Sequence, residues 1–222
     1  MPARSHYHQK LGATDWMPRQ QVVLPQPEEV HLWRIRLQAP PEQLQVDREM
    51  LAADEQARAD KFHYLHDRNE FIIARATLRR LLGNYLDMPP ASLVFQYSEY
   101  GKPELALDSQ LQFNLSHAGS FALIGFTSDR AIGVDLEPVD NLIELARLTS
   151  RFFSPAEAQQ VLQLPVAEQP PAFFRTWTRK EAFIKAHGQG LRLPLDQFAV
   201  TVALDAPLKI EQIDWAPETV DR

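Results

Sequence analysis

Two long stretches with helical periodicity, one in each half of the 222-residue chain, constrain the fold most. They are FIIARATLRRLLG (71–83) and FFRTWTRKEAFIKAHG (173–188), and both end in glycine. Apolar residues in the first stretch recur at helical spacing, which predicts a helix with one buried face. The likeness of the two stretches favours a duplicated architecture. Amphipathic helices also resemble one another by composition alone, so two unrelated helices are the alternative.

Short apolar segments elsewhere predict strands. Two of them, 111–117 and 121–127, flank a short turn and are expected to pair across it. A further helix is expected from 41 to 62, and Ser154-Pro155-Ala156-Glu157 has the pattern of a capping box that begins another. The other expected strands are VHLWRIRL (30–37), LVFQYSEY (93–100), AIGVDLEPV (131–139) and LPLDQFAVTVAL (193–204).

Composition excludes several classes of function. The formal net charge is −6, so no overall basic field exists to hold a nucleic-acid backbone, and no nucleic-acid partner is expected. The absence of cysteine excludes disulfides, thiolate zinc sites and a cysteine nucleophile. No apolar run is long enough for a membrane span or a signal peptide. We therefore expect a soluble, cytoplasmic protein without a membrane partner.

Asp135 and Glu137 lie two residues apart on the predicted strand 131–139, so their side chains should point to the same face. Two carboxylates on one edge can share a hard cation. Mg²⁺ fits such a pair because it completes its octahedron with water and substrate phosphate. A solvated strand face without any ligand is the alternative, and this short pattern alone favours that alternative.

Glu181 strengthens the prediction of a metal site. It shares a helical stripe with Phe173, Trp177 and Lys185, and a stripe that begins with two aromatic residues is expected to be buried. A carboxylate there needs a cation or a hydrogen-bond partner to offset its lost hydration. Either Lys185 alone fills that need, as a surface Glu–Lys pair, or a metal shared with Asp135 and Glu137 does.

Ser116-His117 at the end of a strand and Lys102 in a Gly-Lys-Pro turn are ordinary in isolation. A Ser-His-Asp hydrolase is discounted because adjacent residues on a strand point to opposite faces and no G-x-S-x-G elbow is present.

Taken together, these motifs resemble the Sfp-type 4′-phosphopantetheinyl transferases over about residues 55–205. The matching segments, in order, are GKP (101–103), FNLSH (113–117), IGVDLE (132–137), RFFSPAE (151–157) and WTRKEAFIK (177–185), with Gly188, Gly190-Leu191 and Leu195-Asp196 after them. The combination of G-[ILV]-D-x-E with W-[ST]-x-K-E-[AS]-x-x-K is the specific part.

The resemblance implies an α+β fold of two similar halves related by a pseudo-twofold axis, each with a small antiparallel sheet on a long helix. We expect the halves to be residues 1–129 and 130–222, with the site in the cleft between them. The implied reaction moves the 4′-phosphopantetheine arm of the co-substrate coenzyme A to a serine of an apo acyl or peptidyl carrier protein. Adenosine 3′,5′-bisphosphate is released, Mg²⁺ or Mn²⁺ is required, and the family is often monomeric.

The resemblance also implies roles for individual residues. Asp135, Glu137 and Glu181 would hold the metal, and Asp135, Glu181 and Lys185 would be catalytic, with Glu181 either a ligand or the base that accepts the serine proton. Lys102, Ser116, His117, Lys185, Arg58 and Lys61 would bind the coenzyme, His117 at its 3′-phosphate.

Other predictions stay open at this point. Fewer basic residues precede Phe62 here than in the family, since only Arg58 and Lys61 lie there, among acidic neighbours. Val161, Leu162 and Leu164 are candidate apolar contacts for the carrier, with internal packing as the alternative. Competing functions are a non-catalytic coenzyme A or carrier-binding module and a Mg²⁺-dependent nucleotide phosphohydrolase. The client pathway, such as fatty-acid, polyketide or nonribosomal peptide biosynthesis, is not predicted.

Overall fold

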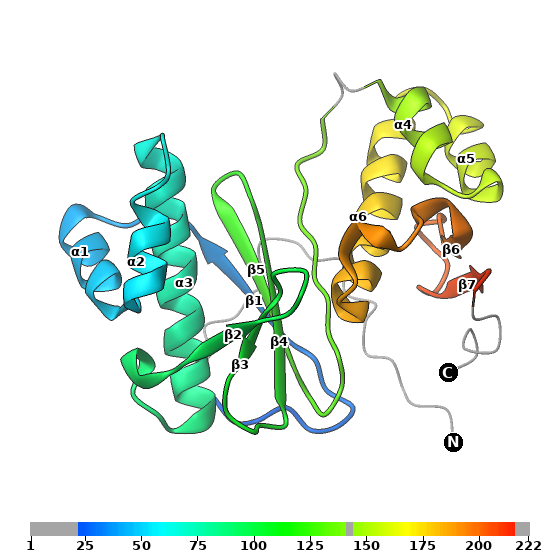
Figure 1. The fold of residues 1–222 in the computed structure, drawn as a ribbon. Coiled ribbons are helices and arrows are strands. Elements are labelled where there is room, and N and C mark those ends of the chain that lie inside the picture. Colours follow the sequence, from blue (N-terminus) through cyan, green and yellow to red (C-terminus); the bar gives the residue numbers. More distant parts are fainter. Residues whose placement is uncertain (1–21, 141–143, 216–222) are drawn as a thin grey trace.

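A computed structural model describes residues 22–140 and 144–215. Its elements are mixed helices and short antiparallel strands in two successive groups (Figure 1). The first group is β1 (His31–Arg36), α1 (Pro41–Met50), α2 (Ala53–Ala59), α3 (Leu65–Leu86), β2 (Phe95–Tyr97), β3 (Pro103–Leu105), β4 (Leu111–Ala118) and β5 (Phe121–Ser128). The second group is α4 (Leu145–Phe152), α5 (Pro155–Leu162), α6 (Gln169–His187), β6 (Phe198–Val200) and β7 (Ile210–Ile213). Three short 3₁₀ helices complete the described elements: η2 (Pro90–Ser92), η3 (Gly190–Arg192) and η4 (Leu195–Gln197).

Each group packs a long helix on a small antiparallel sheet, so the predicted α+β class with two similar halves is confirmed. In the first half the strand order is β1-β5-β4, and β2 pairs with β3 as a separate hairpin. Apolar side chains of α3, including Leu78 and Leu82, share a core with Phe113 of β4 and Ile124 of β5. In the second half α6 shares its core with the β6–β7 hairpin. The boundary after residue 129 stays a prediction.

The strands 111–117 and 121–127 were predicted correctly as a pair, because two apolar runs and the short turn between them are local properties of the sequence. The capping box is also present: the N–H of Glu157 donates to Ser154 Oγ over 3.3 Å, and Glu157 accepts from the N–H of Ser154 over 2.8 Å. No helix within the described ranges is both long and apolar enough to cross a membrane.

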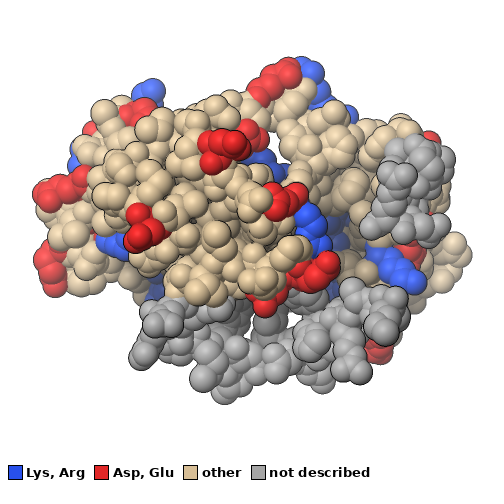
Figure 2. All heavy atoms as spheres, turned by 90° about the horizontal axis from the view of Figure 1, so that it is seen from below, with Lys and Arg blue, Asp and Glu red and all other residues tan. Residues whose placement is uncertain are grey.

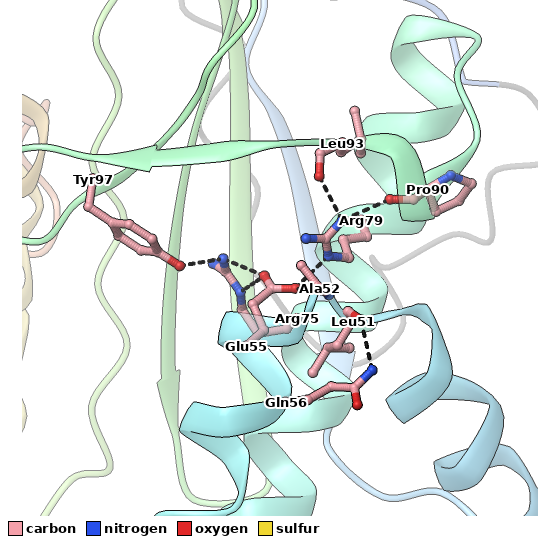
Figure 3. Close-up of polar contacts among 9 residues, drawn as sticks. All are labelled: Leu51, Ala52, Glu55, Gln56, Arg75, Arg79, Pro90, Leu93 and Tyr97. Carbon is pink, nitrogen blue, oxygen red and sulfur yellow. Dashed lines mark hydrogen bonds and ion pairs between the residues drawn. The ribbon is translucent and has the colours of Figure 1, made fainter.

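The single helix expected from 41 to 62 is wrong, because the chain breaks between α1 and α2. Leu51 and Ala52 adopt extended backbone angles there, with ψ of 145° and 161°. Glu55 causes part of this break: it reaches back to the N–H of Ala52 and is held inside the protein by Arg75 and Arg79 of α3 (Figure 3). The buried ion pairs therefore fix a new helix start that periodicity alone does not reveal.

The expected strand at 131–139 is also wrong, since no regular element forms there. This segment runs between the first-half sheet and α6 (Figure 1). The N–H of Val134 donates to the side chain of Asn114 over 2.9 Å instead of to a neighbouring strand. A Cβ on Gly133 would lie 1.8 Å from the carbonyl oxygen of Ala182, so the segment lies directly on the backbone of α6. Ile132 and Val134 are buried, but Leu136 between Asp135 and Glu137 is only half-buried, so the alternation expected of a strand holds only in part.

Two further strand predictions were too long. The expected strand 193–204 forms regular strand only at Phe198–Val200, after the 3₁₀ helix η4. The expected strand 93–100 is reduced to Phe95–Tyr97, and the chain then turns at Gly101, whose φ of 79° is left-handed.

Candidate active site

The predicted site residues meet where β4, the 131–137 segment and α6 come together. An open hollow there is lined by Leu115, Ser116, His117, Asp135, Leu136, Glu137, Trp177, Glu181 and Lys185. The last residues of β4 supply Leu115, Ser116 and His117, and Gly133 lets the 131–137 segment lie directly on the backbone of α6. Seen from below, basic and acidic side chains lie close together near the middle of the molecule (Figure 2).

Three of the predicted residues touch directly. The ammonium of Lys185 lies 2.5 Å from Asp135 Oδ1 and donates to Ser116 Oγ over 3.0 Å. The hydroxyl of Ser116 donates to the same Asp135 oxygen over 3.1 Å. The Asp135 side chain is 4% exposed, and its other oxygen, Oδ2, is buried without a hydrogen-bond partner. The buried Oδ2 atom of Asp135 therefore lacks a hydrogen bond that would replace its lost hydration.

The two other predicted carboxylates are electrostatically coupled to Asp135. Burial raises the pKa of Glu181, and the charges of Asp135 and Glu137 raise it further, while Lys185 opposes them. Burial also raises the pKa of Glu137, with a further rise from Asp135, whereas Lys185 and a hydrogen bond from Trp177 lower it. Three negative groups thus share one nearby ammonium.

This group of residues fits a divalent cation. Three carboxylates against one lysine leave an excess of negative charge, and the unpartnered oxygen of Asp135 needs a positive neighbour. Oxygen ligands are those that Mg²⁺ prefers, and it takes the rest from water and phosphate. The three carboxylates do not all approach one another within 4.8 Å. In the described part of the chain, only His66, Asp67 and Glu70 place ligand atoms that close together.

The predicted coenzyme contacts divide into two groups. Ser116 and the exposed His117 line the hollow with Lys185. Lys102 lines an adjoining hollow that shares Glu181 and Lys185 with the first. Its ammonium is bound to two backbone carbonyl oxygens, those of Ile132 and Lys185.

Arg58 and Lys61 lie elsewhere, near the end of α2. The guanidinium of Arg58 lies 5.2 Å from the ring centre of Phe71, and both basic residues are exposed. Within the described residues, no hydrogen bond or ion pair joins either of them to the lining of the two hollows.

Two residues of the second-half motif have mixed or structural roles. Lys180 is 0% exposed and binds Glu157 Oε2 over 2.6 Å and the carbonyl of Phe198 over 2.5 Å. Trp177 stacks on Phe173, as core packing predicts, and it also lines the hollow beside Glu137.

Sequence reasoning missed the role of Asn114, which fixes the position of Val134 one residue before Asp135. An amide at an otherwise apolar strand position was the available signal. Val161, a predicted carrier contact, is 0% exposed in the second-half core, so that prediction is wrong for this residue. Leu162 and Leu164 are half-buried.

Comparison with known proteins agrees with the family that the motifs indicate. Residues 37–128 match the family model described as 4′-phosphopantetheinyl transferase, N-terminal, and residues 131–219 match that of the 4′-phosphopantetheinyl transferase superfamily. The 4′-phosphopantetheinyl transferase HetI of Nostoc sp. is 38% identical over 199 residues, which cover 88% of this chain and 84% of the relative. The transferase Sfp of Bacillus subtilis is 30% identical over 165 residues, or 74% of this chain and 72% of the relative. The chain therefore belongs to the 4′-phosphopantetheinyl transferase family.

Proposed function

We propose that this chain transfers the 4′-phosphopantetheine arm of coenzyme A to a serine hydroxyl of an apo acyl or peptidyl carrier protein. The reaction depends on Mg²⁺, with Mn²⁺ as a substitute, and releases adenosine 3′,5′-bisphosphate. The observation that carries this proposal is the contact of Lys185 with Asp135 and Ser116, in one hollow with Glu137 and Glu181. Family membership supplies the reaction class, and the hollow supplies charged groups suited to a pyrophosphate.

In the proposed reaction the carrier serine oxygen attacks the phosphorus that bears the pantetheine arm. The bond from this phosphorus to the oxygen of the departing bisphosphate breaks, and the serine proton passes to a base. Asp135, Glu137 and Glu181 would hold the cation, which neutralises charge on the pyrophosphate when it is bound.

Lys185 is placed to bind phosphate. An ammonium has three N–H donors, and two of them serve Asp135 and Ser116, so a third can face a phosphate oxygen in the hollow.

Glu181 is the proposed base. Burial raises the pKa of Glu181, which strengthens this carboxylate as a proton acceptor near neutral pH. The same carboxylate can serve as a metal ligand, and a glutamine at position 181 would remove both functions.

The remaining coenzyme contacts that we propose come from β4 and from the end of α2. His117 and Ser116 would meet the phosphates, His117 at the 3′-phosphate, because both line the hollow beside Lys185. Arg58 and Lys61 would contact the 3′-phosphate from the end of α2, which lies outside the lining of both hollows. We also propose that the protein acts as a monomer in the cytoplasm, and its mass in solution by light scattering checks the first point.

Intact-protein mass spectrometry tests the proposed function. An apo acyl carrier and an apo peptidyl carrier are incubated with coenzyme A, Mg²⁺ and the protein, with EDTA as a control. A mass gain of one phosphopantetheine group that EDTA suppresses is the expected result. Asp135→Ala should abolish the gain and Glu211→Gln, an exposed carboxylate of β7 outside the hollow, should not.

Two outcomes contradict the proposal. No mass gain on either carrier despite coenzyme binding would favour a binding module. Release of phosphate or phosphopantetheine from coenzyme A without any carrier would indicate a phosphohydrolase.

A further inference from the structure

Lys102 lies in a turn whose backbone is firmly held. The turn joins β2 to β3, and the N–H of Ser98 donates to the carbonyl of Lys102 over 2.9 Å. The N–H of Lys102 in turn donates to Ser98 Oγ over 3.1 Å. Pro103 follows directly and fixes the chain direction. The side chain therefore starts from a well-defined point in the first half.

The ammonium of Lys102 ends on two backbone carbonyls of the other site elements. It donates to the carbonyl of Lys185 over 2.8 Å and to that of Ile132 over 3.1 Å. Lys185 belongs to the last turn of α6, where helix carbonyls lack intrahelical partners and the helix dipole is negative. Ile132 is the second residue of the 131–137 segment, which carries Asp135. One cation thus satisfies acceptors on both elements that provide the site carboxylates.

Lys102 has no carboxylate partner among the ion pairs of the described residues. Burial lowers the pKa of Lys102, and the charge of Glu104 opposes this effect. Two neutral carbonyls at hydrogen-bond distance are what keep this ammonium in place. An ammonium has three N–H donors, so a coenzyme phosphate could meet only the third one while these two hydrogen bonds stay in place.

We propose that Lys102 is a positioning residue: it ties the 131–137 segment and the last turn of α6 to the first-half hairpin, and so fixes Asp135 and Lys185 relative to β4. This role differs from the coenzyme contact that the family resemblance implies for this lysine. The positioning role rests on the proposed transfer reaction. Loss of the tie displaces the carboxylates and the lysine that act on the pyrophosphate, without removing a group that binds the coenzyme.

Steady-state kinetics of Lys102→Met separates the two roles. Methionine keeps the apolar stem and removes the ammonium. We expect kcat to fall about ten- to a hundredfold, because small displacements of catalytic groups have effects of this size. The KM for coenzyme A should change less than about threefold. With dephospho-coenzyme A as the substrate, kcat should fall by the same factor. Lys209→Met, at an exposed lysine before β7, is the matched control and should behave as the wild type.

The opposite pattern would overturn the proposal. A large rise in KM with kcat unchanged, absent when dephospho-coenzyme A is the substrate, would mean that Lys102 binds the 3′-phosphate. A rise in KM of equal size for both coenzymes, with kcat unchanged, would place Lys102 on the pyrophosphate and would also overturn the positioning role.

A measurement on the wild-type protein needs no transfer activity. The Nζ resonance of Lys102 in protein with ¹⁵N-labelled lysine is identified by its loss in Lys102→Met. A slowly exchanging signal that keeps its shift when adenosine 3′,5′-bisphosphate binds supports the tie to the carbonyls. A signal in fast exchange with water, or one that moves strongly with the bisphosphate, contradicts it. If no carrier is modified by the wild type, the proposed function fails, whereas this signal still decides the position of Lys102.

Discussion

Glu55 in the first half and Glu157 in the second occupy the same place in a short helix. Each is the third residue of its helix and reaches back to the N–H before the helix, that of Ala52 or Ser154. Each is buried, with 2% and 0% exposure. The helix start and its buried acid are therefore repeated, although serine caps only the second helix with its side chain.

The basic partners of the two glutamates differ in number. Arg75 and Arg79 of α3 both bind Glu55, and Arg79 also binds the carbonyls of Pro90 and Leu93 (Figure 3). In the second half a single basic residue, Lys180, binds Glu157 and the carbonyl of Phe198, and the N–H of Val200 donates to Glu157 Oε1 over 2.8 Å. Both arrangements join a short helix to a long one and to the chain that follows it.

The long helices keep the same spacing after the buried base. Gly83 follows Arg75 by eight residues, and Gly188 follows Lys180 by eight. When the two helices are aligned on these residues, Ala76, which is 0% exposed, corresponds to Glu181 of the candidate site. The first half thus has a methyl group where the second has a carboxylate.

The second difference concerns the basic residue one turn further on. Arg80 corresponds to Lys185 in the same alignment, but Arg80 is bound to Asp47 of α1. Lys185 instead binds Asp135 of the 131–137 segment and Ser116 of the first half. The repeated part of the fold supplies the framework, and these two differences between the long helices distinguish the proposed site from the corresponding place in the first half.

The largest effect is expected from breaking the second-half framework. Glu157→Gln leaves the fully buried Lys180 without its charge partner, which should lower the free energy of unfolding by about 3–5 kcal/mol. Urea denaturation measures this change. The double variant Glu157→Gln with Lys180→Met should recover part of the loss, and no recovery would mean that the pair is not what Glu157 contributes. Glu55→Gln tests the same idea in the first half.

Glu181→Gln should separate activity from stability. Transfer should fall at least about a hundredfold, because ligation of the cation and proton acceptance both need a carboxylate. The melting temperature should stay level or rise, since a repelling charge is removed. Transfer rates and melting curves beside the Glu211→Gln control give the answer. A Glu181→Gln variant with full activity would show that the Glu181 carboxylate is not needed for transfer.

His117→Ala sharpens the assignment of coenzyme contacts to β4. The dissociation constant of coenzyme A should rise about tenfold through loss of one charge-assisted hydrogen bond, while dephospho-coenzyme A should bind as before. Isothermal titration calorimetry measures both. Equal weakening for the two ligands would place His117 away from the 3′-phosphate.

A smaller effect is expected on the pH dependence of stability. Burial and the charge of Asp135 raise the pKa of Glu137 and Glu181, so the folded state holds these protons more tightly than the unfolded state. The free energy of unfolding should therefore fall as pH rises through the window between the unfolded and the folded pKa values. Mg²⁺ should offset this loss, and it should raise the melting temperature more at about pH 8 than at about pH 5. Thermal unfolding of wild type and Glu181→Gln, with and without Mg²⁺, measures the difference. An identical Mg²⁺ effect in both proteins would contradict the coupling.

Local features of the fold were predictable from the sequence, and features set by tertiary contacts were not. The capping box at Ser154 and the paired strands 111–117 and 121–127 depend on neighbouring residues alone. The helix break at Leu51 depends on Glu55 meeting arginines of another helix. The irregular 131–137 segment depends on Gly133 lying against Ala182.

The candidate site shows the same division. Motif spacing identified Asp135, Glu137, Glu181 and Lys185, which the structure brings to one hollow. No spacing rule relates Lys102 to the carbonyl of Lys185, because 83 residues separate them. Contacts between side chains and distant backbone atoms leave no pattern in a single sequence.

The position of the divalent cation tests the central claim most directly. Crystals of the protein with coenzyme A and Mn²⁺ in place of Mg²⁺ would locate the ion by its anomalous scattering. We predict one peak in contact with oxygens of Asp135, Glu137 and Glu181 and with the pyrophosphate. A peak at His66, Asp67 and Glu70 with none in the hollow would contradict the account of a second-half metal site.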